Sequence, residues 1–166
     1  MAATSSTTKS EVRPLLQTTY NEANAEFSPD GRWIAYESTE SGQSQVYVRP
    51  FPNLESGRWQ VSTGGGSRPA WARNGRELFY LDNTNLLMAV PVQTAGATFV
   101  PGNPAKVFDK RYASTGTIGR YYDVSPDGRR FLMIKDASEQ TADTTPASMV
   151  VVLNWIEELK QRVQAK

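Results

Sequence analysis

The 166-residue sequence contains no cysteine and no histidine. Without cysteine, the chain can form neither a disulfide nor a thiolate nucleophile or metal ligand. Without histidine, it lacks the usual general base and the commonest ligand of transition metals, which excludes a Ser-His-Asp triad within one chain. Any catalysis would therefore depend on carboxylates, Tyr, Lys, Arg or a hard metal ion.

Long apolar segments and charge of one sign are lacking as well. The longest apolar run, residues 149–153, is far shorter than a membrane span. The formal net charge is +1, from 18 basic and 17 acidic residues, so there is no one-sided basic field of the kind that drives nucleic-acid binding. We therefore expect neither membrane insertion nor a nucleic-acid partner.

Residues 1–10 have no apolar core of the kind found in a signal peptide, and they offer no apolar face to bury. They are predicted to be a disordered N-terminal lead. With no export signal or membrane segment in it, the chain as it stands is expected in the cytoplasm.

Three segments of the sequence align with one another around a turn. The turns are Asp30-Gly31, Asn74-Gly75 and Asp127-Gly128. An Asp-Gly or Asn-Gly pair between apolar residues is the strongest short-range signal of a β-hairpin, because glycine supplies the positive φ that the turn requires. The interval between the turns suits a four-stranded blade of a β-propeller.

Further strand-like segments complete the repeats. They are residues 45–51 and 58–62 in the first repeat, 86–92 and 105–108 in the second, and 148–153 in the third. The third repeat has no fourth strand after it, and residues 11–18 are predicted to supply one as an outer strand, in which Pro14 suits an edge position. Apolar residues then recur at helical spacing, which predicts a short C-terminal α-helix at about 155–164.

The predicted fold is all-β, with three four-stranded blades that make half of a six-bladed propeller. The domain spans residues 11–166, with blades at about 19–63, 64–109 and 118–154, the last together with strand 11–18. Two connections rich in Thr, Ala, Gly and Pro, residues 94–104 and 137–147, are predicted to be mobile loops. A recurrent set of aromatic residues is predicted to form the core between blades: Phe27, Trp33, Trp59, Trp71, Phe79 and Phe131. Tyr36 and Tyr47 are expected to pack across adjacent strands.

Several segments resemble the TolB-type, WD-like β-propeller repeats of bacteria. The matching residues are 27–36, 46–52, 62–66, 123–133 and 152–160. Together they look like the C-terminal part of the propeller regions appended to bacterial membrane-anchored serine/threonine kinases and related sensors. The resemblance implies a protein-binding or ligand-sensing platform, often extracytoplasmic, and the chain itself carries no kinase motif.

Three blades in an open arc would leave two blade faces uncovered. The resemblance implies six blades, so we expect a homodimer in which two copies close one ring head to tail, with residues 11–18 of one copy as the outer strand of the partner's last blade. A fragment of a longer propeller is the alternative.

The connections that precede the innermost strands are the predicted site, because in propellers these loops surround one mouth of the central channel. Candidate ligand-binding residues there are Asn21, Glu22, Asn24, Arg68, Arg120, Tyr121 and Asp123. If a metal ion is present, its ligands are expected to be Glu22, Asn24, Glu26 and Asp123, which carry the hard oxygens that calcium prefers. Asp30, Asn74 and Asp127 are interpreted as turn formers and not as calcium ligands.

Three functions remain open at this stage. The first is a non-catalytic module, without cofactor, that binds a protein or a small molecule at the channel mouth. The second is a calcium-dependent hydrolase of the lactonase, esterase or phosphotriesterase type, which the absence of histidine disfavours. The third is a structural or designed assembly unit.

Overall fold

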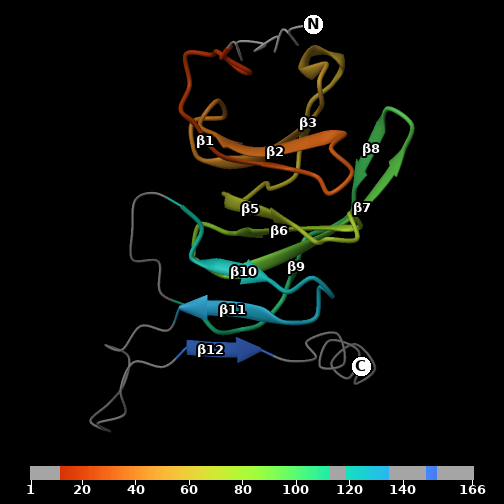
Figure 1. Cartoon of the computed structure of the whole chain (residues 1–166). Helices are drawn as coiled ribbons and strands as arrows, with labels where there is room; N and C mark the ends of the chain where they lie inside the picture. Colours follow the sequence, from red (N-terminus) through yellow and green to blue (C-terminus); the bar gives the residue numbers. More distant parts are fainter. Residues whose placement is uncertain (1–11, 113–118, 135–148, 153–166) are drawn as a thin grey trace, which may run out of the picture.

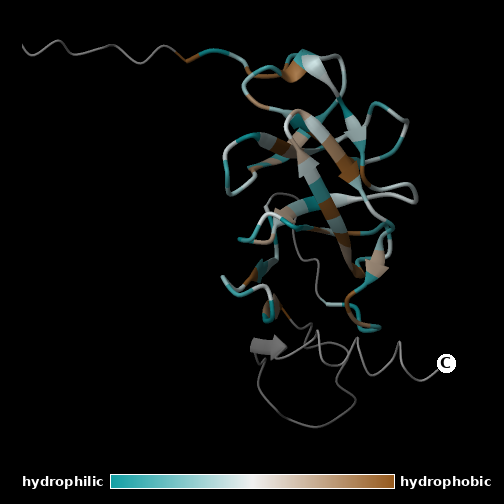
Figure 2. Cartoon of the chain, turned by 90° about the vertical axis from the view of Figure 1, so that its right-hand side faces the viewer, coloured by the Kyte–Doolittle hydropathy of each residue, from teal (hydrophilic) through white to brown (hydrophobic). Residues whose placement is uncertain are grey.

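The computed structural model describes residues 12–112, 119–134 and 149–152, the last segment as backbone only. Three antiparallel sheets follow one another along the chain and lie stacked in that order (Figure 1). Apolar residues lie mainly in the strands, and the connections between them are largely hydrophilic (Figure 2). The structure is therefore all-β in these residues, apart from one short 3-10 helix.

Sheet 1 has the order β1-β2-β3-β4. Its elements are β1 (Glu22–Phe27), β2 (Trp33–Ser38), β3 (Gln45–Pro50), the 3-10 helix η1 (Leu54–Ser56) and β4 (Trp59–Gln60). The first turn forms as predicted, because Oδ1 of Asp30 accepts the backbone N–H of Arg32 at 3.1 Å and Gly31 has a φ of 69°. Tyr36 lies opposite Tyr47 across β2 and β3, with their ring centroids 6.0 Å apart, so this expected pair is confirmed.

Sheet 2 contains an additional strand that the sequence did not predict. Its elements are β5 (Ser67–Trp71), β6 (Glu77–Leu81), β7 (Leu87–Ala95), β8 (Thr98–Pro101) and β9 (Ala105–Lys106). The prediction of a mobile loop at 94–104 is wrong, since the end of β7 and β8 form a hairpin. Phe99 accounts for this order: it is 1% exposed, and its ring centroid lies 5.3 Å from that of Trp33 and 5.7 Å from that of Trp59.

Sheet 3 consists of β10 (Tyr122–Val124), β11 (Phe131–Ile134) and β12 (Met149–Val152) in the described residues. Along β11, Phe131 and Met133 are buried, whereas Leu132 and Ile134 are 40% and 47% exposed on the other face. The predicted loop at 137–147, the lead at 1–10 and the C-terminal helix at 155–164 lie outside the described residues.

The segment predicted as an outer strand of the third blade has no strand at residues 12–18. It lies instead near the outer face of sheet 1, where Leu15 and Leu16 border a cavity together with Ile34 and Leu54. Apolar side chains on this face attract the segment, so the single chain covers part of the sheet face that a neighbouring blade would otherwise cover. The expected pairing of this segment with a second copy stays a prediction.

Two hydrophobic cores hold the stack together. The first lies between sheets 1 and 2 and includes Trp33, Val48, Leu78 and Val90. The second lies between sheets 2 and 3, where the rings of Phe79 and Phe131 meet edge to face at 5.1 Å.

Most of the predicted aromatic core is present. Trp33, Trp71, Phe79 and Phe131 are buried, and Trp59 is partly buried against the first core. Phe27 is an error in that prediction, because it is 48% exposed and its ring contacts Phe51.

Candidate functional site

The first strand of sheet 1 and the first strand of sheet 2 carry the same irregularity near their N-terminal ends. The register of β1 shifts between Ala23 and Glu26, and that of β5 shifts between Ser67 and Ala70. Within these shifts lie Asn24, with a φ of 48°, and Arg68, with a φ of 53°. Positive φ is uncommon outside glycine and marks a β-bulge that redirects a side chain.

These two residues are equivalent in the sequence repeat, and Glu37 of β2 connects them. The Asn24 amide Nδ2 donates to Glu37 Oε1, and the backbone N–H of Arg68 donates to Glu37 Oε2 at 3.1 Å. One carboxylate thus joins the bulge of sheet 1 to the bulge of sheet 2.

Arg68 in turn contacts the connection that leads into sheet 3. Its Nε donates to the carbonyl oxygen of Gly119 at 2.7 Å, and Nη2 donates to the Tyr121 hydroxyl at 3.2 Å. Its guanidinium carbon also lies 4.4 Å from the centroid of the Tyr121 ring, which is cation–π geometry. Tyr121 occupies the repeat position of Asn24 and Arg68, so the three equivalent residues are linked in series.

Arg120 makes a second connection between the sheets. Its Nη1 pairs with Glu26 of β1, and Nη2 lies 3.3 Å from Oδ1 of Asp123. Glu26 is itself held in place by Trp71, whose backbone N–H donates to Oε1 at 3.2 Å. The side chain of Asp123 is 68% exposed, so this end of the network opens to solvent.

Tyr122 is a buried residue that connects sheet 3 to Arg68 of the network. Its hydroxyl donates to the carbonyl oxygen of Arg68 at 2.7 Å, and the residue is 4% exposed. Burial raises the pKa of this hydroxyl well above its ordinary value, so it stays a donor throughout the physiological range.

We call this set the inner-strand site. It comprises Asn24, Glu26, Glu37, Arg68, Arg120, Tyr121 and Asp123. The structure thus brings together five of the seven predicted ligand-binding residues. Glu37 was missed; the signal for it is a charged residue that follows the apolar run of β2.

The other two predicted residues, Asn21 and Glu22, lie outside the inner-strand site. The backbone N–H of Asn21 donates to Thr39 Oγ1 at 3.1 Å. Oε1 of Glu22 accepts from Thr18 at 2.7 Å and from Ser38 at 3.2 Å, while its buried Oε2 has no hydrogen-bond partner among the described residues. Glu22 borders the cavity of about 310 Å³ on the outer face of sheet 1, so it belongs to that cavity and not to the inner-strand site.

The four residues predicted as calcium ligands do not converge on one point. Glu26 and Asp123 both pair with Arg120, so a guanidinium lies between these two carboxylates. Asn24 donates to Glu37, and Glu22 binds the hydroxyls of Thr18 and Ser38. Across the described ranges, no three acidic side chains are grouped as a metal ion would require.

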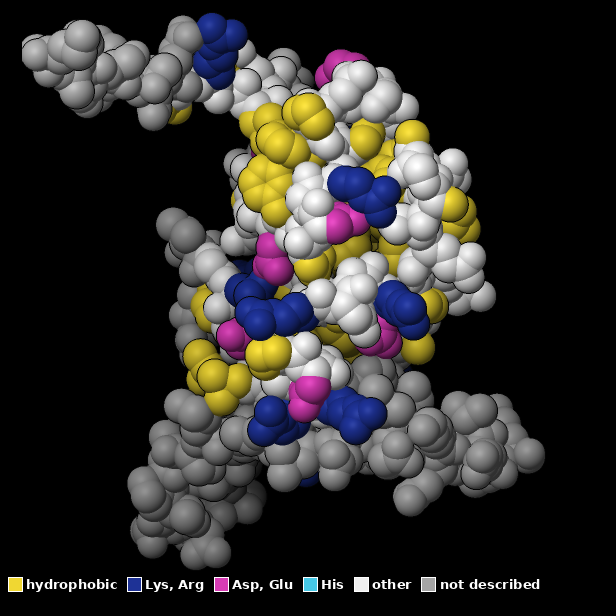
Figure 3. All heavy atoms as spheres, turned by 45° about the vertical axis from the view of Figure 1, so that its right-hand side comes forward, with side chains coloured by type: hydrophobic (Ala, Val, Ile, Leu, Met, Phe, Trp, Pro, Cys, Tyr) yellow, Lys and Arg dark blue, Asp and Glu magenta, His cyan; other side chains and the backbone are white. Residues whose placement is uncertain are grey.

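Basic and acidic side chains are interspersed over the described part of one face of the molecule (Figure 3). Within the residues that the structure describes, no helix has the length and apolar character needed to cross a membrane.

The chain was compared with known proteins. No family model matches it. Over 65 residues, 38% of this chain, it is 37% identical to dipeptidyl aminopeptidase BI of Pseudoxanthomonas mexicana, of which the match covers 9%.

Solved structures give a broader likeness. An oligogalacturonate lyase from Vibrio parahaemolyticus, a β-propeller, matches with a TM-score of 0.54 at 19% identity, over 78% of this chain and 34% of the lyase. TolB from Acinetobacter baumannii matches with a TM-score of 0.42 at 13% identity, over 84% of this chain and 45% of TolB. The likeness to the lyase supports a propeller-like fold and, at this identity, the fold alone. The chain spans about a third of the length of the lyase and about a tenth of that of the aminopeptidase.

Proposed function

We propose that this protein is a non-catalytic binding module of the β-propeller type and that its ligand contacts the inner-strand site. The observation that carries the proposal is the convergence of three repeat-equivalent residues, Asn24 and Arg68 from the first strands of sheets 1 and 2 and Tyr121 from the connection into sheet 3. They offer an amide, a guanidinium and a phenol in a part-buried setting, a combination typical of binding surfaces.

The charges at the site favour binding over hydrolysis. Glu26 and Asp123, the carboxylates closest to the solvent opening, are paired with Arg120. A carboxylate that acts as a metal ligand or general base must present a free oxygen to the reacting group, and these pairings compete with that role.

The proposed working unit is a homodimer that closes a six-bladed ring. In such a ring, sheet 3 of one copy packs on the outer face of sheet 1 of the other. Leu132 and Ile134 provide exposed apolar side chains on sheet 3. Leu15 and Leu16 lie on the receiving face and become part of the interface. The match covers 34% of a lyase with a propeller-like fold, and in this proposal a second copy supplies the remaining blades.

Mass in solution by light scattering tests the ring. We expect twice the 18.4 kDa of one chain, and we expect Leu132→Glu to reduce the mass to that of one chain. Val100→Glu is the matched control, since Val100 is 51% exposed on β8, away from the proposed interface. A mass of 18.4 kDa for the unchanged protein would contradict the homodimer.

Selection of random peptides on the immobilised protein tests the binding face. Peptides that depend on the inner-strand site should lose binding to Asp123→Lys and keep binding to Glu55→Lys, a charge change at a side chain that is 88% exposed on η1. Equal binding to both variants would place recognition elsewhere. Calcium-dependent turnover of an ester, lactone or phosphotriester would overturn the non-catalytic proposal.

A further inference from the structure

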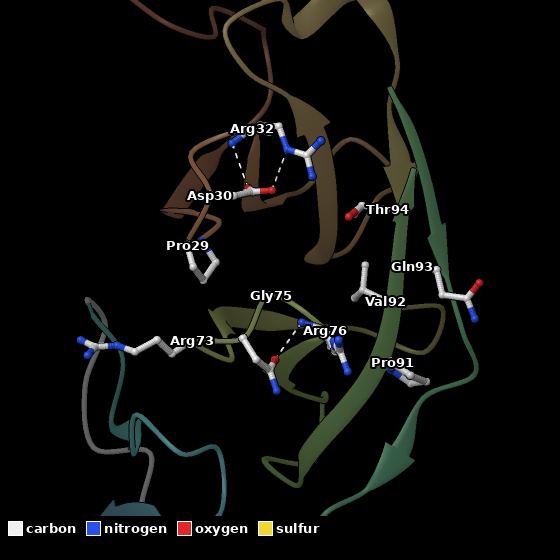
Figure 4. A pocket seen from close by; sticks show the side chains of 11 residues that line it. Pro29, Asp30, Arg32, Arg73, Gly75, Arg76, Pro91, Val92, Gln93 and Thr94 are labelled. Atoms are coloured by element: carbon white, nitrogen blue, oxygen red, sulfur yellow. Dashed lines mark hydrogen bonds and ion pairs between the residues drawn. The ribbon is translucent and has the colours of Figure 1, made fainter. Parts of the chain in front are cut away.

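A second candidate site lies at the other end of the first strands. The turn after β1, the turn after β5 and the middle of β7 enclose an open cavity of about 760 Å³ (Figure 4). Its charged lining residues are Asp30, Arg32, Arg73 and Arg76. Three arginines against one aspartate give this cleft a net positive charge, in a chain whose formal net charge is only +1.

The charge arises because the second repeat departs from the other two at its turn. Where the first and third repeats have Pro29-Asp30 and Pro126-Asp127, the second has Arg73-Asn74. Arg73 adds a positive charge and Asn74 removes a negative one, and both residues line the cavity.

Asn74 retains the structural role of the aspartate while giving up its charge. Its Oδ1 accepts the backbone N–H of Arg76 at 2.8 Å, as Oδ1 of Asp30 does for Arg32 at 3.1 Å. Asp30 also holds the Nε of Arg32 at 2.7 Å. Hydrogen bonds from Ser28 and Arg32 outweigh the effect of burial, so the pKa of Asp30 is lowered and the pair stays ionised. Among the residues that the structure describes, no acidic side chain forms an ion pair with the Arg76 guanidinium.

The two repeat-equivalent arginines are fixed at their backbones in the same way. The carbonyl oxygen of Arg32 accepts the N–H of Phe51 at 2.8 Å, and that of Arg76 accepts the N–H of Val92 at 2.7 Å. In Figure 4 the Arg32 side chain lies beside sheet 1 next to Asp30, and the Arg76 side chain lies beside β7, whereas Arg73 extends to the far side of its turn. Arg32 and Arg76 are therefore the central cations, and Arg73 lies at the rim.

The dimensions and walls of the cavity indicate the size of the ligand. A volume of about 760 Å³ exceeds that of an inorganic ion and falls in the range of small-molecule sites. Pro29, Pro91 and Val92 supply apolar contacts beside the guanidinium groups. Planar guanidinium groups favour the paired oxygens of carboxylates and phosphates.

We infer that this inter-sheet cleft binds a small organic anion, whose carboxylate or phosphate groups contact Arg32 on one wall and Arg76 on the other. The site is separate from the inner-strand site, so either proposal stands if the other fails. Its selectivity for anions depends on Asn74, because an aspartate at this position would place a negative charge in the turn that holds Arg76.

Titration with inorganic phosphate and with citrate, at an ionic strength kept constant with sodium chloride, tests the site. The readout is the shift of the arginine Nε–H signals in nuclear magnetic resonance spectra. We expect saturable shifts of Arg32 and Arg76 beyond those caused by chloride. Whether phosphate or citrate binds more tightly distinguishes the two ligand chemistries. Shifts no larger than those with chloride, for both probes, would overturn the inference.

Arg76→Ala should weaken binding about tenfold, the loss expected for one charge-assisted hydrogen bond. Arg129→Ala is the matched control, because Arg129 has the same place in the third repeat and is absent from the cavity lining. Equal loss in both variants would contradict the assignment.

Exchanging the residue types at positions 74 and 30 distinguishes the effect of charge on binding from the effect of turn structure. Asn74→Asp restores the residue found in the other two turns, so the fold should persist while binding weakens about threefold from the added negative charge in the cleft. Asp30→Asn should strengthen binding by a similar factor. An unchanged affinity in Asn74→Asp would show that the departure of the second repeat has no part in binding.

Discussion

Arg68 stacks on Tyr121 with its guanidinium carbon 4.4 Å from the ring centroid, although the two residues are 53 positions apart in the chain. The pair connects the bulge of β5 to the connection before β10. It makes the inner-strand site a structural junction as well as a proposed binding surface, so substitutions there are expected to affect stability too.

Replacing Arg68 should measure this junction. Arg68→Ala removes the stacking and the 2.7 Å bond to Gly119, so we expect the free energy of unfolding in urea to fall by about 1–3 kcal/mol. Arg68→Gly loses the same contacts but relieves the positive φ of 53°, and should be about 1 kcal/mol more stable than Arg68→Ala. If both variants have the same free energy of unfolding as the unchanged protein, the contacts of Arg68 do not contribute to stability.

The β7–β8 hairpin should be part of the core. Phe99→Ala removes a side chain that is 1% exposed and surrounded by Trp33, Trp59 and Trp71, so we expect a loss of about 3–5 kcal/mol in thermal or urea unfolding. Val100→Ala, on the exposed face of the same strand, should change stability by less than about 0.5 kcal/mol. Similar effects of the two substitutions would mean that the hairpin does not pack as described.

The turn of the second repeat should require glycine for its backbone conformation and not for space. Gly75 has a φ of 68°, and an added Cβ would meet nothing within 4 Å. Gly75→Ala is therefore expected to cost about 1 kcal/mol through backbone strain alone. Gly64, where an added Cβ is equally free and φ is not in the strained range, is the control. Gly64→Ala should leave the urea midpoint unchanged, and a loss equal to that of Gly75→Ala would argue against the turn geometry.

Alkaline pH should destabilise the fold through its buried tyrosines. Burial and the nearby Asp82 raise the pKa of Tyr80 to about 12, from an ordinary value of 10.0. Because the folded state holds this proton more tightly, its contribution to stability is complete below pH 10 and is lost as the pH rises from 10 to about 12. Tyr80→Phe should make the fall in unfolding free energy shallower over this interval, as followed by urea unfolding at several pH values. An unchanged pH profile would contradict the raised pKa.

The hairpins of the repeat were predictable because their turns have strict chemical requirements. Gly31 and Gly75 both adopt the positive φ that Asp-Gly and Asn-Gly turns need, and the strands that follow them, β2 and β6, are buried along most of their length. The β8 strand escaped prediction because Phe99 is the one large aromatic residue in a segment otherwise rich in Thr, Ala and Gly, a composition typical of loops.

Most of the inner-strand site was found from one rule, that connections before the first strands of successive blades lie close together. The contacts between the residues of the site could not be predicted. The positive φ of Arg68 has no sequence signature, and Asn24 carries only the modest preference of asparagine for that region. Glu37 joins them from the second strand, and that depends on the register of β1 against β2, where Ala23 lies opposite Glu37. Residues 11–18 were assigned to an outer strand because the third repeat lacked a fourth strand, whereas Leu15 and Leu16 of this segment border the outer face of sheet 1.

β7 is one uninterrupted nine-residue strand with two sets of partners. Its first part pairs with β6 and β9, and its last part pairs with β8, whose Phe99 packs on Trp33 of the neighbouring sheet. Sheet 1 therefore cannot separate from sheet 2 without withdrawing Phe99 and loosening the backbone of β7. The amide hydrogens of β2 and β7 should accordingly exchange with solvent in a single cooperative opening, so that two adjacent repeats behave as one unfolding unit.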